Sequence, residues 1–242
     1  PKDECQTLIE IPRLKHKKNS VVKCQYIEIP QIETTYRHFG SQPHWLWGYE
    51  HGFNEYQVVI GNEAVNSKFS ENNIPRLLGM DLVRLGLERG KSALSAVNII
   101  TNLISTYGQG KFTNNHKSSN YDNSFIVADP NEAYIIEAAN KEWVTKKIDS
   151  TIGISNIYSI NTDWTNISST AKQTSIENKW YIESQERLDF FKTFSNDEIK
   201  GVKEGRGEFR RIRSCTYLNL FKGKLDLNIF LSLLKDHSNG EN

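Results

Sequence analysis

The sequence predicts a mixed α/β domain in which helices cover an antiparallel sheet. Two adjacent amphipathic helices are expected over Leu77 to Glu88 and Ser92 to Ile104, and three short strands joined by tight turns follow them. Adjacent helices beside a strand meander are typical of layered α/β domains. No internal repeat or linker divides the 242 residues, so we expect one domain over residues 1–242.

Composition and charge exclude several classes of function. The chain carries 30 Lys and Arg against 29 Asp and Glu, and this balance predicts no nucleic-acid partner. No apolar run approaches the roughly 20 residues that a bilayer span needs, so we expect no membrane span. Three scattered cysteines, Cys5, Cys24 and Cys215, form no disulfide framework and indicate a cytoplasmic protein.

The first half of the chain contains two expected strands and then the helix pair. Val21 to Ile29 alternates around β-branched residues and ends at Pro30, and Glu55 to Gly61 is apolar at its centre. Gly90 follows the first helix and is expected to cap it. The apolar positions at helical spacing are Leu78, Leu82 and Leu85 in the first helix, and Leu94 and Val97 with Ile100 or Ile104 in the second.

A three-stranded meander is expected after the helices. Its strands are Ser124 to Asp129, Glu132 to Ala139 and Glu142 to Ile148. Asp129 to Asn131 predicts a type I turn because Pro130 fixes φ, and Asn140 begins a second tight turn.

The remaining third of the sequence is more polar. We expect a strand over Thr151 to Ile160, a loop over Asn161 to Lys179 and a helix over Trp180 to Phe194. The basic run Lys200 to Arg213 is interrupted by glycines and is expected to be a solvated loop, from which one arginine could turn inward to bind a carboxylate. Leu225 to His237 is expected to form a final amphipathic helix.

Few residues suggest chemistry by themselves. The histidines form no ligand cluster, so we expect neither a metal nor a cofactor. Gly86 to Ser92 resembles a phosphate loop, but it is one residue short and lies between two helices, which favours helix caps. Trp45 and Trp47 are interpreted as core or strand-edge residues, with a pocket lining as the alternative. Neither Cys5 nor Cys24 has a histidine partner nearby in sequence.

Two asparagines carry the functional hypothesis. Asn54 lies in a Gly-Phe-Asn-Glu turn, and Asn156 ends a Gly-Ile-Ser-Asn segment. Turn asparagines usually serve backbone conformation. A side-chain amide can also stabilise the tetrahedral intermediate of acyl transfer, so the two interpretations stay open.

Several segments in order resemble the secernin family, which belongs to the cysteine dipeptidases among the N-terminal-nucleophile hydrolases. They are Trp45 to Glu50, Gly52 to Glu55, Val59 to Val65, Leu77 to Gly90, Tyr107 to Gly110, Asn123 to Asp129 and Ile154 to Asn156. The resemblance covers Pro1 to Ile160 well and the remainder loosely, through Cys215 and Leu234 to His237.

The resemblance implies a four-layer αββα sandwich and a cysteine-type exopeptidase that hydrolyses small peptides. A cysteine at the mature N-terminus would attack the amide carbonyl, with its own α-amine as base. The family pattern implies Asn54 and Asn156 as oxyanion donors. It also implies an arginine that holds substrate or thiolate, for which Arg213 is our choice.

The sequence departs from the family pattern at both ends. Pro1 to Glu4 resembles the segment that follows the strands carrying the nucleophile, and Asn242 falls short of the usual family length. We therefore expect an internal portion, incomplete at both ends, which does not catalyse as written. The alternative is an inactive cytosolic secernin-fold protein that acts in exocytosis or vesicle trafficking, or as an assembly component. Its expected partners are then further copies of itself or the other proteins of an assembly.

Overall fold

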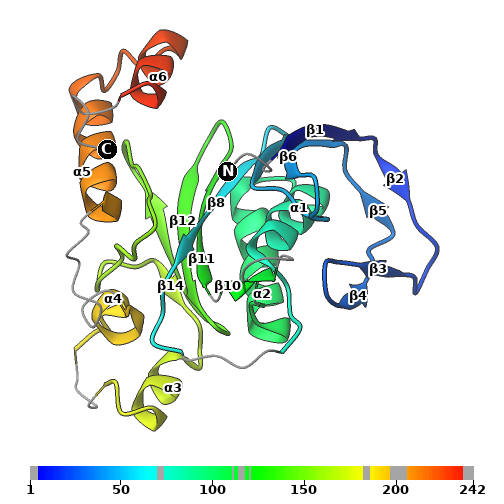
Figure 1. Cartoon of the computed structure of the whole chain (residues 1–242), viewed down its shortest axis with the longest axis horizontal. Helices are drawn as coiled ribbons and strands as arrows, with labels where there is room; N and C mark the ends of the chain where they lie inside the picture. The colour runs from blue at the N-terminus through cyan, green and yellow to red at the C-terminus, as the bar shows by residue number, and fades with distance from the viewer. Residues whose placement is uncertain are drawn as a thin grey trace.

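An eight-stranded antiparallel sheet forms the centre of the computed structural model, which describes residues 5–69, 74–110, 112–113, 118–119, 121–181, 186–196 and 206–236 (Figure 1). The strand order is β1-β6-β7-β8-β11-β12-β13-β14. These strands are β1 (Gln6–Ile11), β6 (His38–Pro43), β7 (His51–Asn54), β8 (Val59–Val65), β11 (Asp122–Ala128), β12 (Ala133–Ala139), β13 (Glu142–Ile148) and β14 (Asn166–Ile167).

Three small two-stranded ladders accompany the main sheet. They pair β2 (Leu14–Lys15) with β5 (Thr34–Thr35), β3 (Val21–Lys23) with β4 (Glu28–Pro30), and β9 (Phe112–Thr113) with β10 (Ser118–Ser119). The single strand expected over Val21 to Ile29 is therefore wrong. The chain turns back at Cys24, whose backbone N–H donates to the carbonyl of Ile27 at 2.9 Å. Cys24 is buried at this turn, so its apolar character marks a packed turn and not a continuous strand.

The expected strand over Glu55 to Gly61 is also wrong in its bounds, because a turn separates β7 from β8. The Oδ1 atom of Asn54 accepts hydrogen bonds from the backbone N–H groups of Tyr56 and Val58. Gln57 adopts a left-handed φ of 63° between them. Residues 55–58 form the turn, so the strand runs from Val59 to Val65.

The two expected helices are present and pack as a pair on one face of the sheet (Figure 1). They are α1 (Gly79–Arg89) and α2 (Ala93–Tyr107), and Ser92 caps α2 by accepting from the backbone N–H of Ser95. Leu82 and Leu85 lie in the core cluster beneath them. Leu78 packs in a separate small cluster with Leu46 and Met80. Leu94 is 43% exposed, so the apolar face proposed for α2 begins at Val97.

The meander is confirmed. Strand β11 pairs with β12, and β12 pairs with β13, both antiparallel. In the first turn Asp129 Oδ1 accepts from the N–H groups of Asn131 and Glu132, and Asp129 Oδ2 accepts from Ala93 N at the start of α2. The second turn contains Asn140 at φ 57°. One aspartate therefore ties the meander to the helix layer.

The opposite face of the sheet is covered by irregular chain and two short helices. The strand expected over Thr151 to Ile160 is wrong, because this segment forms no ladder. It is held instead by the buried Glu137 carboxylate, which accepts from the backbone N–H groups of Ser159 and Ile160. A second cluster of buried apolar residues, including Phe190 and Phe194, fills this side.

The loop expected over Asn161 to Lys179 contains β14 and the helix α3 (Ala171–Glu177). The buried Glu142 carboxylate explains this local order, because it accepts from the hydroxyls of Ser168, Thr170 and Thr174. Within the expected helix from Trp180 to Phe194, only α4 (Phe190–Phe194) is helical in the described part.

The C-terminal helices lie at the edge of the molecule, away from α1 and α2 (Figure 1). They are α5 (Arg206–Leu220) and α6 (Leu227–Leu234), and none of the residues of α6 is buried. The end of the basic run expected as a loop is therefore helical, while its residues 200–205 lie outside the described ranges, as does His237. The mixed α/β class with a large antiparallel sheet is confirmed. No helix in the described chain is long and apolar enough to cross a membrane.

Candidate functional site

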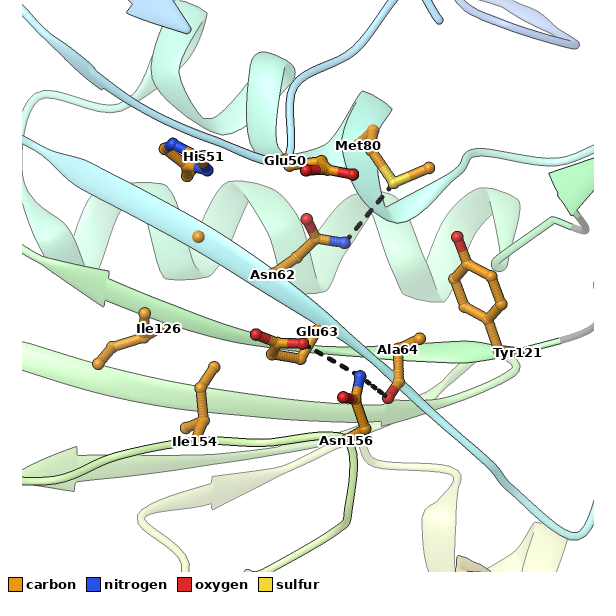
Figure 2. A pocket seen from close by; sticks show the side chains of 11 residues that line it. Glu50, His51, Asn62, Glu63, Ala64, Met80, Tyr121, Ile126, Ile154 and Asn156 are labelled. Carbon is orange, nitrogen blue, oxygen red and sulfur yellow. Dashed lines mark hydrogen bonds between the residues drawn. The ribbon is translucent and has the colours of Figure 1, made fainter. Parts of the chain in front are cut away.

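A pocket of about 410 Å³ opens beside strands β7 and β8 and the start of α1 (Figure 2). Its polar lining consists of Glu50, His51, Asn62, Glu63, Tyr121 and Asn156, and its apolar lining includes Met80, Ile126 and Ile154. None of the described lining residues is a cysteine, serine or threonine. The pocket therefore combines amide and carboxylate side chains with a small apolar surface.

Asn156 is held in this pocket by three hydrogen bonds. Its Nδ2 donates to Oε2 of Glu63 at 3.0 Å and to the carbonyl of Ala64 at 2.9 Å. Its Oδ1 accepts from Nη2 of Arg210 on α5 at 2.8 Å. Because an amide nitrogen carries two hydrogens, both donors of Asn156 are engaged in this structure.

Glu63 is the carboxylate closest to that amide. Its pKa is raised above the ordinary glutamate range, chiefly because burial penalises the charged form. The charge of Arg210 and the hydrogen bond from Asn156 act in the opposite direction, while the nearby charge of Glu50 adds to the rise. Glu50 itself accepts from Nε2 of Gln6 at 2.7 Å.

Asn62 lies next to Glu63 on β8 and begins a chain of hydrogen-bonded side-chain amides. Its Nδ2 donates to Oδ1 of Asn123 at 3.0 Å, and Nδ2 of Asn123 donates to Oε1 of Gln109. The Oδ1 of Asn62 is buried and has no hydrogen-bond partner among the described residues. Tyr121, on the same pocket, has a pKa raised to about 12 by burial, so it stays neutral at neutral pH.

The structure does not bring Asn54 together with Asn156. Asn54 is 3% exposed, and its Nδ2 donates to the carbonyls of Leu87 and Gly90 at 2.9 and 2.7 Å. Its Oδ1 holds the turn between β7 and β8. The side chain joins that turn to the end of α1, and no donor remains for a substrate. The family-implied role of Asn54 as an oxyanion donor therefore has no support in its geometry.

Arg213 also lies away from the pocket lining. Its Nε donates to Oδ2 of Asp236 at 2.7 Å, which links α5 to the end of α6 on the surface. The arginine that reaches Asn156 is Arg210, one turn earlier on α5. Sequence reasoning chose Arg213 within this run of arginines, whereas the arginine that contacts Asn156 is Arg210, because the helix α5 that orients the run was not expected.

Asn62, Glu63 and Arg210 are the site residues that sequence reasoning did not single out. Asn62 and Glu63 are in the Val59 to Val65 segment that carries the resemblance, so a signal was present. The expected strand ended at Gly61, which placed both residues outside it. Their position in the pocket follows from the extension of β8 to Val65.

The remaining chemical candidates have other surroundings. Burial raises the pKa of Cys24 to about 12, which keeps it a neutral thiol, and Cys5 is exposed. The described residues contain no group of three or more His, Cys, Asp or Glu that could hold a metal ion. Trp47 is outside the pocket, and the guanidinium of Arg84 lies over its ring at 4.1 Å.

No protein-family model matches the sequence. Two variants of the conjugated bile acid hydrolase from Clostridium perfringens are similar in structure, each at 13% identity, with TM-scores of 0.54 and 0.51. Both alignments cover 95% of this chain and 70% of the hydrolase. Penicillin V acylase from Agrobacterium tumefaciens matches at 11% identity with a TM-score of 0.47 over 62% of its length. The likeness to the first protein shows the N-terminal-nucleophile hydrolase fold, as the fold class expected from the sequence implied.

Proposed function

We propose that the protein hydrolyses amide bonds of small peptides as a secernin-like, cysteine-type exopeptidase. One observation carries the proposal: Asn62, Glu63 and Asn156 meet in one pocket of a chain with an N-terminal-nucleophile hydrolase fold. The similarity in fold to a conjugated bile acid hydrolase supports the hydrolase class. The peptide substrate rests on the resemblance to secernins.

The proposed reaction places the substrate carbonyl in this pocket. A cysteine at a mature N-terminus gives its thiol proton to its own α-amine and attacks the carbonyl carbon. The carbonyl oxygen becomes negative, and Nδ2 of Asn156 is the donor proposed to stabilise it. The C–N bond then breaks, the leaving amine takes the proton, and water releases the acyl group from sulfur.

The test begins with the native protein purified from its source. N-terminal sequencing and intact mass identify the residue that begins the mature chain, and dipeptide turnover is then measured. We expect an N-terminal cysteine and turnover that is abolished when this cysteine is changed to alanine, while Cys5→Ala leaves turnover intact. A correctly processed protein that is inactive on a broad dipeptide panel would contradict the proposal.

A non-enzymatic role in assembly or vesicle trafficking is the second candidate. The observation that favours it is the exposed apolar surface on the C-terminal helices, where Leu220, Leu227 and Leu234 are 75%, 73% and 81% exposed. This role predicts an oligomer or complex that dissociates when Leu227 and Leu234 are changed to serine. Measuring the mass in solution for the native protein and this double variant separates the two candidates.

The proposal also treats the chain as one cytoplasmic domain. The main sheet supports a single domain because its strands come from residues as distant as Gln6 and Ile167. The three cysteines are all free thiols, which supports a reducing compartment. Limited proteolysis tests the first point, since a single domain resists division into two stable fragments.

A further inference from the structure

The hydrogen bonds of Asn156 leave no free donor for a substrate. One of its two amide hydrogens is directed at the backbone carbonyl of Ala64 in β8, and the other at the Glu63 carboxylate. The carbonyl of Ala64 is fixed in a strand paired with β11. The carboxylate of Glu63 belongs to a side chain, so it is the partner that can be exchanged when a ligand enters.

The Glu63 carboxylate is also suited to bind a cation. One of its oxygens is occupied by Asn156, and the other points away from Asn156 in Figure 2. The charged and titratable groups around it are Glu50 and His51 at β7, Tyr121 before β11, and Arg210 on α5. Arg210 already donates to Oδ1 of Asn156. A positive ligand group would thus face a partly buried carboxylate, with Arg210 as a competing positive charge.

The rest of the pocket limits the size of such a ligand. A volume of about 410 Å³ lies at the lower end of the range for small-molecule sites. Ile126 and Ile154 line the pocket near Glu63 and offer an apolar surface to a short hydrocarbon chain (Figure 2). An ammonium group on a compact, partly apolar molecule matches this lining.

We propose that Glu63 determines the specificity of the pocket by pairing with the ammonium group of an unblocked small peptide. Because the ammonium group competes for the same carboxylate charge, this pairing weakens the hydrogen bond from Asn156 to Glu63 and makes one donor of Asn156 available. The inference rests on the proposed peptide substrate and names the group that is recognised. Glu63 acts as a specificity and positioning residue. It binds the ammonium group of the peptide, and it makes the side-chain amide of Asn156 available to the carbonyl oxygen of the peptide.

The experiment compares a peptide that carries a free ammonium group with the same peptide in which an uncharged acetamide replaces that group. Binding of glycyl-leucine and N-acetylglycyl-leucine to the 242-residue chain is measured by calorimetry at pH 7, and mass spectrometry checks that each peptide stays intact. We expect the unblocked peptide to bind about tenfold more tightly, as one desolvated ion pair can provide. In Glu63→Gln the ratio should fall to about twofold or less, while Glu28→Gln, at an exposed position of strand β4, should leave the tenfold ratio unchanged.

A pH series provides a readout that a structural role would not change. Burial raises the pKa of Glu63, so its charge should be lost at a higher pH than for an exposed glutamate. The preference for the unblocked peptide should decline as the pH falls through that pKa, although the peptide ammonium stays charged. The Glu63→Gln variant should show no such decline, and its circular dichroism should match that of the parent chain.

The outcomes separate this inference from the proposed function. Equal binding of the two peptides, binding of neither, or an unchanged preference in Glu63→Gln overturns the inference. If the native protein hydrolyses acetylated and unblocked peptides at equal rates, amide hydrolysis is supported and the proposed role of Glu63 is refuted. If the native protein prefers the unblocked peptide but hydrolyses no peptide, the proposed role of Glu63 is supported and the exopeptidase proposal is refuted.

Discussion

The guanidinium of Arg210 donates to the side-chain oxygen of Asn156 at 2.8 Å, across 54 positions of sequence. This contact fixes the orientation of the Asn156 amide, because an arginine can only donate and must face the oxygen. The nitrogen of Asn156 is thereby directed toward Glu63 and Ala64 in the pocket. Helix α5, which lies apart from the helix pair, thus contributes to the geometry of the candidate site.

The first prediction separates the two arginines of α5. In the native protein, Arg210→Ala should reduce dipeptide turnover by about tenfold to a hundredfold, because Asn156 loses the group that orients it. Arg213→Ala removes a surface pair with Asp236 and should leave turnover and melting temperature close to the parent values. Steady-state kinetics on both variants tests this, and a larger loss in Arg213→Ala would favour the assignment made from sequence.

The second prediction concerns Asn54. The Asn54→Ala variant should lose about 1–3 kcal/mol of unfolding free energy, because the carbonyls of Leu87 and Gly90 and the turn N–H groups lose buried partners. Urea unfolding followed by circular dichroism measures the loss. Gln57→Ala, a substitution at an exposed position of the same turn, is the matched comparison for local backbone effects. A destabilisation below the error of the measurement would contradict the structural role of Asn54.

The third prediction tests the helix layer. Leu82 is fully buried in the main core, and Leu82→Ala should cost about 2–5 kcal/mol of unfolding free energy. Leu94, on the neighbouring helix and 43% exposed, offers the same substitution outside the core and should cost less than about 1 kcal/mol. Comparable losses for the two variants would mean that the buried face of α1 is assigned incorrectly.

Local signals were sufficient for the helices and the meander. The spacing of Leu82 and Leu85 and the turn residues Asp129 and Asn140 act over a few positions, and the structure uses them as expected. The strand prediction for Thr151 to Ile160 was wrong, because the β-branched residues of this segment reflect burial and not pairing with another strand. Its backbone N–H groups pair with Glu137 from a distant strand, which no local pattern reveals.

The candidate site was predicted only in part for the same reason. Asn156 lines the pocket, but its partners come from β8 and α5, which lie far away in sequence. Asn54 lies in a turn of the kind expected for a functional asparagine. Its side chain instead hydrogen-bonds the turn after β7 to the end of α1. A sequence motif identifies the residue type, and tertiary contacts decide which atoms remain available to a ligand.

The fourth prediction is a pH dependence of stability. Burial raises the pKa of Glu137 to about 7, and it also raises the pKa of Asp81 to about 7. In the unfolded chain both carboxyls ionise near pH 4, so the folded state binds more protons between about pH 4 and 7. The stability that these groups contribute is therefore complete below the unfolded pKa and is lost as the pH rises through 7.

The slope expected from one such group is at most about 1.4 kcal/mol per pH unit. Unfolding by urea at pH 4.5, 5.5, 6.5 and 7.5 measures it in the parent chain and in Glu137→Gln. The variant should lose the Glu137 part of the slope and keep the part due to Asp81. It should also be less stable at pH 4.5, since glutamine offers one acceptor oxygen where the carboxyl group has two, and one of the N–H groups of Ser159 and Ile160 then faces an NH2 group. Stability that rises with pH over this range would contradict the raised pKa values.

The last prediction concerns catalysis by the native protein and assigns a function to one atom. Asn156→Ala removes the proposed oxyanion donor and should lower kcat by roughly 10²–10³, with a smaller effect on KM, because the negative oxygen exists only in the transition state. Asn156→Asp keeps the shape but places a negative charge beside Glu63, so it should be at least as inactive as the alanine variant.

The comparison with Asn54 makes this last result specific. If activity depends on stability alone, Asn54→Ala and Asn156→Ala should lose activity in proportion to their unfolding free energies. If Asn156 acts on the reacting oxygen, Asn156→Ala loses kcat while its melting temperature stays close to that of the parent, and Asn54→Ala shows the opposite pattern below its melting temperature. A normal kcat in Asn156→Ala would remove Asn156 from the reaction and leave it as the link between β8 and α5.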